Sequence, residues 1–145
     1  MRRGVKRTAL GLLILLVLAQ LIRPERSNPA TEPGRTIRSQ SAELAAILDR
    51  SCGDCHSNNT VWPWYTQVAP LSWLMAYGVK AGRKAVNFSE WAGYSPEQQR
   101  ALLNQSCQDV SRGKMPGSAW ISLHHEARLS AEEIAIICRA AGSQP

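Results

Sequence analysis

One five-residue motif constrains this chain more than any other feature, Cys52-Gly53-Asp54-Cys55-His56. The C-x-x-C-H pattern is typical of covalent haem c attachment. Its two thiols can add to the vinyl groups of one macrocycle, while the adjacent imidazole reaches the iron. The motif therefore predicts that Cys52 and Cys55 bind one haem covalently and that His56 is an axial ligand of the iron.

Two other functions of paired cysteines fit this sequence less well than haem attachment. A redox-active C-x-x-C pair lies after a strand in a βαβ unit, and no segment of this chain has the strand pattern. A structural zinc site needs four ligands, and a second Cys/His pair at suitable spacing is missing.

The opposite side of the iron needs a second ligand or a vacancy. Met115 stands in Gly113-Lys114-Met115-Pro116, directly after the predicted end of a helix. A thioether on a loop stiffened by proline suits this role, because the soft sulfur favours ferrous iron. We predict Met115 as the second axial ligand. The alternatives are His124 or His125, an open iron, and a core-filling role for Met115.

The N-terminus has the layout of an export signal. Four basic residues precede an apolar run over residues 8–22, TALGLLILLVLAQLI. A helix of that run is about 22 Å long, against a bilayer core of about 30 Å, and slight thinning of the bilayer would accommodate it. We expect residues 1–23 to be a signal-anchor or transmembrane segment. Cleavage after Ala19 is the alternative, although it would fall inside the apolar run.

The distribution of charge indicates the partners of the chain. Residues 1–26 hold six basic residues and one acidic residue, so five of the six net positive charges belong to the leader. A nucleic-acid module carries its basic patch on the folded domain, so we expect no nucleic-acid partner. The basic end stays in the cytoplasm, which predicts a single-pass protein of a bacterial inner membrane with its haem domain in the periplasm.

The remainder divides into a tether and a helical domain. Residues 24–40 are rich in Pro, Ser and Thr and predict an extended tether. Residues 41–145 predict the haem-binding domain, because apolar residues recur at helical spacing. Four helices should begin near Ser41, Pro70, Ser95 and Ser130, and no segment alternates as a strand would. The predicted fold class is all-α.

Residues 51–91 resemble the small, membrane-anchored haem-binding domain family of bacterial cytochrome c-like proteins, and the likeness extends over roughly residues 10–140. The matching elements are Cys52-x-x-Cys55-His56-Ser57-Asn58, Pro63-Trp64-Tyr65, Pro70-x-x-Trp73, Gly82-Arg83, Asn87-Phe88-Ser89-x-Trp91 and Gly113-Lys114-Met115-Pro116. The resemblance implies a cytochrome c-like helical domain with one covalent haem at the inner membrane, and it places Met115 in the family's Met-Pro loop.

Aromatic residues gather within forty residues of the motif. We predict that Trp64, Tyr65, Trp73 and Trp91 contribute to the wall of the haem pocket, and the alternative is an ordinary core. Arg83 is predicted to neutralise a haem propionate, and the alternative is an isolated exposed charge.

Cys107 and Cys138 lie on the apolar faces of the two C-terminal helices. An exported domain permits a disulfide between them. The alternative is two buried free thiols that act as small hydrophobes.

Together these features predict a membrane-tethered, mono-haem c-type cytochrome that transfers electrons in the periplasm and has no catalytic residue. The redox partner is not indicated. A haem-based ligand or gas sensor, in which Met115 leaves the iron, is the alternative. A small haem peroxidase is a weaker one, because it needs an open iron and a distal acid–base group.

Overall fold

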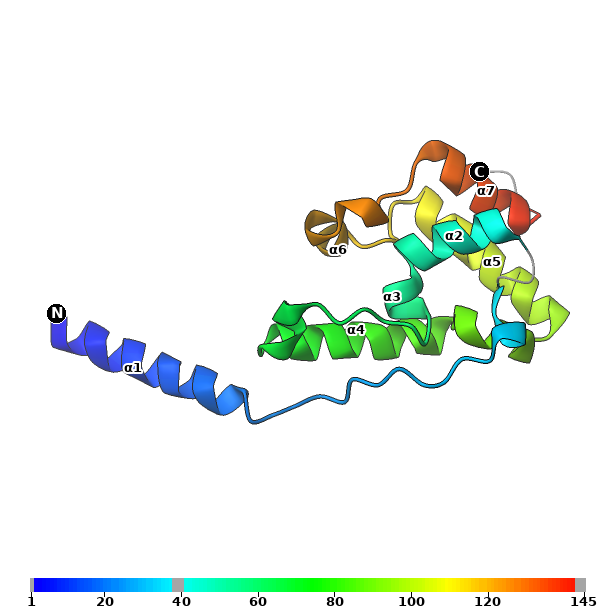
Figure 1. Ribbon diagram of the computed structural model, residues 1–145. Helices are drawn as coiled ribbons and strands as arrows, with labels where there is room; N and C mark the ends of the chain where they lie inside the picture. The colour runs from blue at the N-terminus through cyan, green and yellow to red at the C-terminus, as the bar shows by residue number, and fades with distance from the viewer. Residues whose placement is uncertain (1, 38–40, 143–145) are drawn as a thin grey trace.

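The structure is a computed structural model that describes residues 2–37 and 41–142. Over these residues its regular elements are all helices or 3₁₀ turns and it contains no strand, so the all-α prediction is confirmed. Figure 1 shows α2 and α5 with α7 on one side of the short helix α3, and α4 on the other side.

The four predicted helices are α2 (Ala42–Ser51), α4 (Leu71–Ala85), α5 (Pro96–Ser111) and α7 (Ala131–Ala140). Their starts follow from local capping. The Ser41 hydroxyl accepts a hydrogen bond from the Leu44 N–H, and Ser95 and Ser130 each complete a capping box. Gly113 and Gly142 follow α5 and α7 with positive φ angles, which glycine adopts at no steric cost.

Further short elements fill the connections between these helices. Two are α-helical turns, α3 (Gly53–His56) and α6 (Ser118–Leu123). Four are 3₁₀ turns: η1 (Pro33–Arg35), η3 (Trp64–Gln67), η4 (Phe88–Gly93) and η5 (His125–Ala127). These turns are too short to carry a periodic apolar pattern, and the sequence therefore did not predict them.

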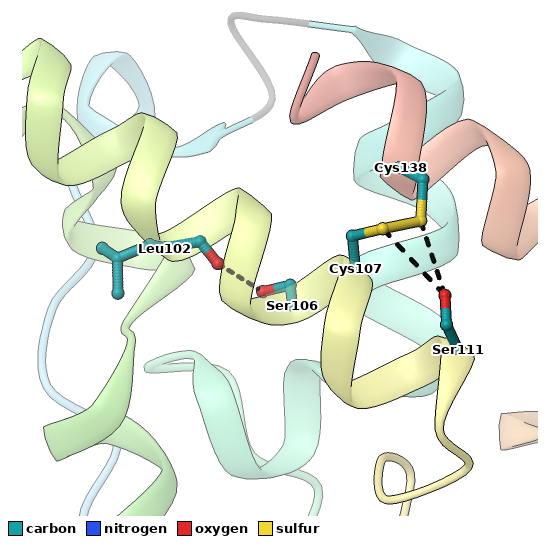
Figure 2. The surroundings of a disulfide bond; sticks show 5 residues. All are labelled: Leu102, Ser106, Cys107, Ser111 and Cys138. Carbon is teal, nitrogen blue, oxygen red and sulfur yellow. Dashed lines mark hydrogen bonds between the residues drawn. A yellow bond between two sulfur atoms is a disulfide. The ribbon is translucent and has the colours of Figure 1, made fainter. Parts of the chain in front are cut away.

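The core lies between α2, α5 and α7. Its buried side chains include Leu44, Leu48, Leu103 and Ile137. Cys107 of α5 and Cys138 of α7 are joined by a disulfide, with their Cα atoms 4.8 Å apart. Figure 2 shows this bond, with the hydroxyl of Ser111 beside both sulfur atoms.

Helix α1 (Arg2–Ala19) extends away from the domain (Figure 1) and exposes its apolar side chains. Among the described residues, no helix is both long enough and apolar enough to cross a membrane. The predicted membrane-spanning segment over residues 1–23 is therefore not supported. The physical reason is that α1 includes four basic residues and ends before Leu21 and Ile22, so the helix holds only part of the apolar run.

The chain between α1 and η1 has no regular secondary structure, and it lies against the folded domain. The Arg26 guanidinium donates to the Thr66 carbonyl oxygen at 3.0 Å, and the Asn28 amide donates to the Thr60 carbonyl oxygen at 2.9 Å. The predicted tether is extended, but side-chain hydrogen bonds hold its first half in place.

Candidate functional site

A cavity of about 450 Å³ adjoins α3 and brings together segments far apart in the sequence. Cys52, Cys55 and His56 line one part of it, and Met115 lines another. Small residues of α4 contribute a third part: Gly78, Ala81, Gly82 and Ala85. A second cavity of about 190 Å³ shares Cys52, His56 and Met115 with the first and extends toward α5.

Helix α3 arranges the motif around one backbone oxygen. The Cys52 carbonyl accepts the N–H of Cys55 at 3.1 Å and the N–H of His56 at 2.9 Å. This turn directs both thiols and the imidazole to one cavity. The two cysteines are not bonded to each other, so both thiols are free to react with a third group.

Neither thiol has the character of a redox-active cysteine. Burial, and then the neighbouring Cys55, raise the pKa of Cys52 to about 12. Burial also raises the pKa of Cys55. Reactive C-x-x-C thiols have lowered pKa values, so these environments disfavour the thiol-redox alternative.

His56 is oriented by the end of α4. Its Nδ1 donates to the carbonyl oxygen of Val86 at 3.2 Å, and Val86 is the residue that follows α4. This bond fixes the neutral tautomer and leaves Nε2 as the nitrogen with a free lone pair. Burial lowers the pKa of His56, which favours the same neutral form. The imidazole is therefore prepared as a metal ligand.

Gly82 lets α4 approach α3 closely. A Cβ on Gly82 would lie 2.9 Å from the carbonyl carbon of Cys55 and 3.1 Å from its Cβ, and it would collide with the carbonyl oxygen. Only glycine fits at this point. The C-x-x-C-H motif is thus seated directly against the α4 backbone.

The loop after α5 presents Met115 to both cavities. The N–H groups of Lys114 and Met115 both donate to the Asp109 carbonyl oxygen, at 2.9 and 3.2 Å. Pro116 is buried next to Met115, whose own side chain is 41% exposed. The structure therefore brings the predicted second ligand to the cavity that His56 lines.

The two histidines offered as alternative ligands are placed elsewhere. The Nδ1 of His124 donates to the Trp120 carbonyl oxygen at 3.2 Å, and its Nε2 accepts from the Tyr65 hydroxyl at 2.9 Å. Both ring nitrogens of His124 are thus occupied. His125 is exposed and lines neither cavity. Neither histidine of this alternative lines a cavity with His56.

None of the four aromatic residues predicted for the pocket wall lines either cavity. Trp64 is 79% exposed, Trp91 is buried in the core, and Trp73 lines a groove against the extended segment after α1. Tyr65 forms a hydrogen bond with His124, which stacks on the cavity residue Trp120. The aromatic residue that lines the cavity is Trp120, whose ring stacks on His124 at 3.6 Å between centroids. The sequence signal that could have identified Trp120 as a cavity residue is its position five residues after Met115.

Arg83, predicted to neutralise a haem propionate, lines neither cavity and is bonded elsewhere. Its Nε donates to the Ser57 carbonyl oxygen and one Nη to the Ser27 carbonyl oxygen, both at 2.7 Å. The other Nη donates to Thr60 Oγ1 at 2.8 Å and Asn28 Oδ1 at 3.0 Å. Arg83 therefore fastens the extended N-terminal segment to the loop after α3.

The charged groups beside the cavities are different residues. Arg50 lines the larger cavity and forms an ion pair with Glu133 at 2.8 Å. Lys114 lines the smaller one and pairs with Asp109 at 3.1 Å. Asp54 also lines the larger cavity, and burial raises the pKa of its carboxyl group. Arg50 and Lys114 are the cations that can meet an acidic group of a bound ligand.

Comparison with known proteins yields one match. A family model described as a haem-binding domain matches residues 14–142, which include the motif, α4 and the Met115 loop. No curated protein and no solved structure matches the chain.

Proposed function

Because this chain belongs to the haem-binding domain family, we propose that it binds one haem covalently through Cys52 and Cys55, with His56 as an axial ligand of the iron. The observation that carries the proposal is the shared cavity. Two free thiols and an imidazole with an unpartnered Nε2 meet there, beside glycines that leave room for a flat macrocycle.

We propose Met115 as the second axial ligand. Its backbone is held by the Asp109 carbonyl oxygen, and the buried Pro116 restricts the loop. Trp120 and the small residues of α4 line the same cavity as Met115. A thioether ligand raises the reduction potential, because soft sulfur favours ferrous iron.

We propose electron transfer as the activity, as in a c-type cytochrome. When bound, haem supplies a one-electron couple between ferric and ferrous iron. The protein's part is to hold the ligands. Val86 orients His56, and Asp109 positions the loop that carries Met115. No acid–base group is required for this activity.

We further propose that the chain is tethered to a bacterial inner membrane with the haem domain in the periplasm. The basic start before an apolar run supports this orientation. The exposed apolar side chains of α1 support a lipid environment. The Cys107–Cys138 disulfide suits an oxidising compartment.

A ligand or gas sensor is the second candidate. The exposure of the Met115 side chain favours it, because a thioether at the surface can leave the iron for an incoming ligand. Carbon monoxide distinguishes the two functions. Slow or absent binding to the ferrous protein at neutral pH supports electron transfer, whereas rapid binding supports the sensor.

The haem assignment is tested by in-gel haem staining of the denatured full chain. The stain should be present in the wild type and absent from the variant Cys52→Ala/Cys55→Ala. The matched control is Cys107→Ala/Cys138→Ala, which removes two other cysteines and should keep the stain. Staining of the first variant would refute covalent attachment through the motif.

A further inference from the structure

A group of exposed apolar side chains surrounds the amino-terminal end of α4. We call this surface the α4 corner; it is formed by Trp64, Val68, Leu71, Trp73 and Leu74. Trp64 and Leu74 are 79% and 67% exposed. An exposed cluster of two tryptophans with aliphatic residues is unusual on a soluble surface and marks a site of contact.

Hydrogen bonds fasten the α4 corner to the end of the apolar N-terminal run. The Gln20 amide accepts from the Ala69 N–H at 2.8 Å and donates to the Ala69 carbonyl oxygen at 3.4 Å. The Trp73 indole donates to the Ile22 carbonyl oxygen at 2.9 Å. The exposed side chains of Leu21 and Ile22 therefore lie next to the corner.

We propose that the α4 corner rests in the interface of the lipid bilayer that holds α1, so that the folded domain has a fixed orientation on the membrane. The inference depends on the proposed membrane tether and adds a contact surface to it. Tryptophan suits such a position, because its ring is amphipathic and is enriched at the level of lipid headgroups.

The length of the apolar run gives a reason for this contact. A helix over residues 8–22 is about 8 Å shorter than the hydrocarbon core, and α1 itself ends at Ala19. A corner of five apolar side chains beside the end of the run adds to the apolar surface at that end. The contact thus compensates for the short helix.

The backbone of the corner is also prepared for a medium with little water. The carbonyl oxygens of Thr66 and Gln67 accept from the guanidinium groups of Arg26 and Arg23, at 3.0 and 2.9 Å. Ala69 is paired through both its N–H and its carbonyl oxygen, as described above. Unpaired backbone groups are costly near lipid, and here side chains of the N-terminal segment satisfy them.

This geometry favours lipid over a protein partner. Any molecule that covers the corner must approach within a few residues of the apolar run, where the bilayer surface lies. A consequence concerns the haem site. Gly78 lines the cavity one turn after Leu74, about 6 Å along α4, so the haem would be held close to the membrane surface.

The test uses the haem-loaded full chain in nanodiscs of phosphatidylcholine and phosphatidylglycerol that contain a diazirine-bearing lipid. Illumination inserts the lipid into side chains that it touches, and mass spectrometry locates the insertion. We expect labelling of residues 68–74 as well as α1. The α5 peptide is the internal control and should stay unlabelled, because α5 lies on the side of the domain away from α1 (Figure 1).

A matched pair of variants makes the test specific. Val68→Glu places a charge in the corner and should reduce labelling of residues 71–74 several-fold. Val61→Glu makes the same substitution at a more exposed valine outside the corner (68% exposed, against 45% for Val68), whose N–H donates to Asp54, and should leave the labelling unchanged. The haem absorption spectrum of each variant verifies that the domain is folded.

The outcomes separate this inference from the proposed function. Labelled α1 with an unlabelled corner would overturn the membrane contact, leave the tether intact and assign the corner to a protein partner. An unlabelled α1 would refute the tether and the contact together. Labelling of the corner that Val68→Glu does not reduce would also overturn the inference.

Discussion

The disulfide between Cys107 and Cys138 supports a prediction that can be worked through in full. Both cysteines are at most 5% exposed and join α5 to α7 within the core. The loop that carries Met115 leaves the end of α5, so this cross-link holds the helix from which the loop starts. Its removal by reduction, or by Cys107→Ala/Cys138→Ala, should destabilise the whole domain.

The expected magnitude follows from the sequence separation of 31 residues. On the chain-entropy model, a cross-link that closes a loop of this size stabilises the folded state by about 3.7 kcal/mol at 25 °C. The paired alanine variant also loses the packing of two buried sulfur atoms, at a further cost of about 1–2 kcal/mol. These losses are large against a total unfolding free energy of about 5–15 kcal/mol.

The assay is urea unfolding of the haem-loaded full chain in detergent, followed by far-ultraviolet circular dichroism. With a denaturant slope of about 2 kcal/mol per molar, reduction should lower the midpoint by about 2 M urea. The reduced sample is prepared by reduction in urea followed by refolding, because the disulfide is buried. Ser111→Ala is the control. It removes only the hydroxyl beside the two sulfur atoms and should change the free energy of unfolding by less than about 0.5 kcal/mol.

Two results would refute the reasoning. Equal midpoints with and without reductant would mean that the cross-link contributes nothing to stability. Two reactive thiols per denatured, non-reduced holoprotein would mean that the disulfide is not formed at all, since the remaining two cysteines are proposed to carry the haem.

Three further predictions concern the site. Gly82→Ala should lower the free energy of unfolding by about 1–3 kcal/mol and reduce the haem stain. Gly34→Ala is the control and should do neither, because a Cβ there meets no protein atom within 4 Å and Gly34 lines neither cavity. Tyr65→Phe removes the hydroxyl bonded to His124 and should lower the free energy of unfolding in urea by about 1 kcal/mol. The haem stain should stay unchanged, and an unchanged free energy of unfolding would exclude a role for this bond in stability. Met115→Ala should lower the reduction potential in a redox titration and abolish the absorption band of methionine–iron ligation; an unchanged spectrum would exclude Met115 as a ligand.

The parts of the fold that the sequence predicted are those with local causes. Ser41, Ser95 and Ser130 start helices because each side chain bonds an N–H three residues later. Gly113 follows α5 because the chain turns through a positive φ angle there. Such signals lie within a few residues of the feature that they determine, so no tertiary information is needed.

The parts that the sequence could not predict depend on distant partners. Arg83 donates hydrogen bonds to the carbonyl oxygens of Ser57 and Ser27, which lie 26 and 56 residues earlier in the chain. Trp91 is buried in the core and Trp120 lines the cavity, and the local sequence offers no signal of this difference beyond the position of Trp120 five residues after Met115. Whether a side chain faces the core, the cavity or another segment depends on how the helices pack. The local sequence pattern does not contain this information.

The N-terminal run depends on both local pattern and a distant partner. Its apolar content predicts contact with a membrane, which stays a prediction, and α1 exposes apolar side chains. The apolar run continues to Ile22, whereas α1 ends at Ala19, next to the Gln20 side chain that pairs with Ala69. The end of α1 therefore coincides with a hydrogen bond to a residue 49 positions later in the chain, and hydropathy alone does not indicate such a contact.

The two proposed iron ligands are held by separate parts of the molecule. His56 is bonded to the Val86 carbonyl oxygen at the end of α4, and Gly82 of α4 allows α3, which carries His56, to pack closely against α4. Met115 is fixed to α5 through the Asp109 carbonyl oxygen, and the disulfide secures α5 to α7. The hydrogen bond between Tyr65 and His124 connects the two parts beside the cavity. The strength of the methionine–iron bond should therefore depend on contacts between these parts as well as on Met115 itself, and perturbing Tyr65 or the disulfide should weaken it without touching either ligand.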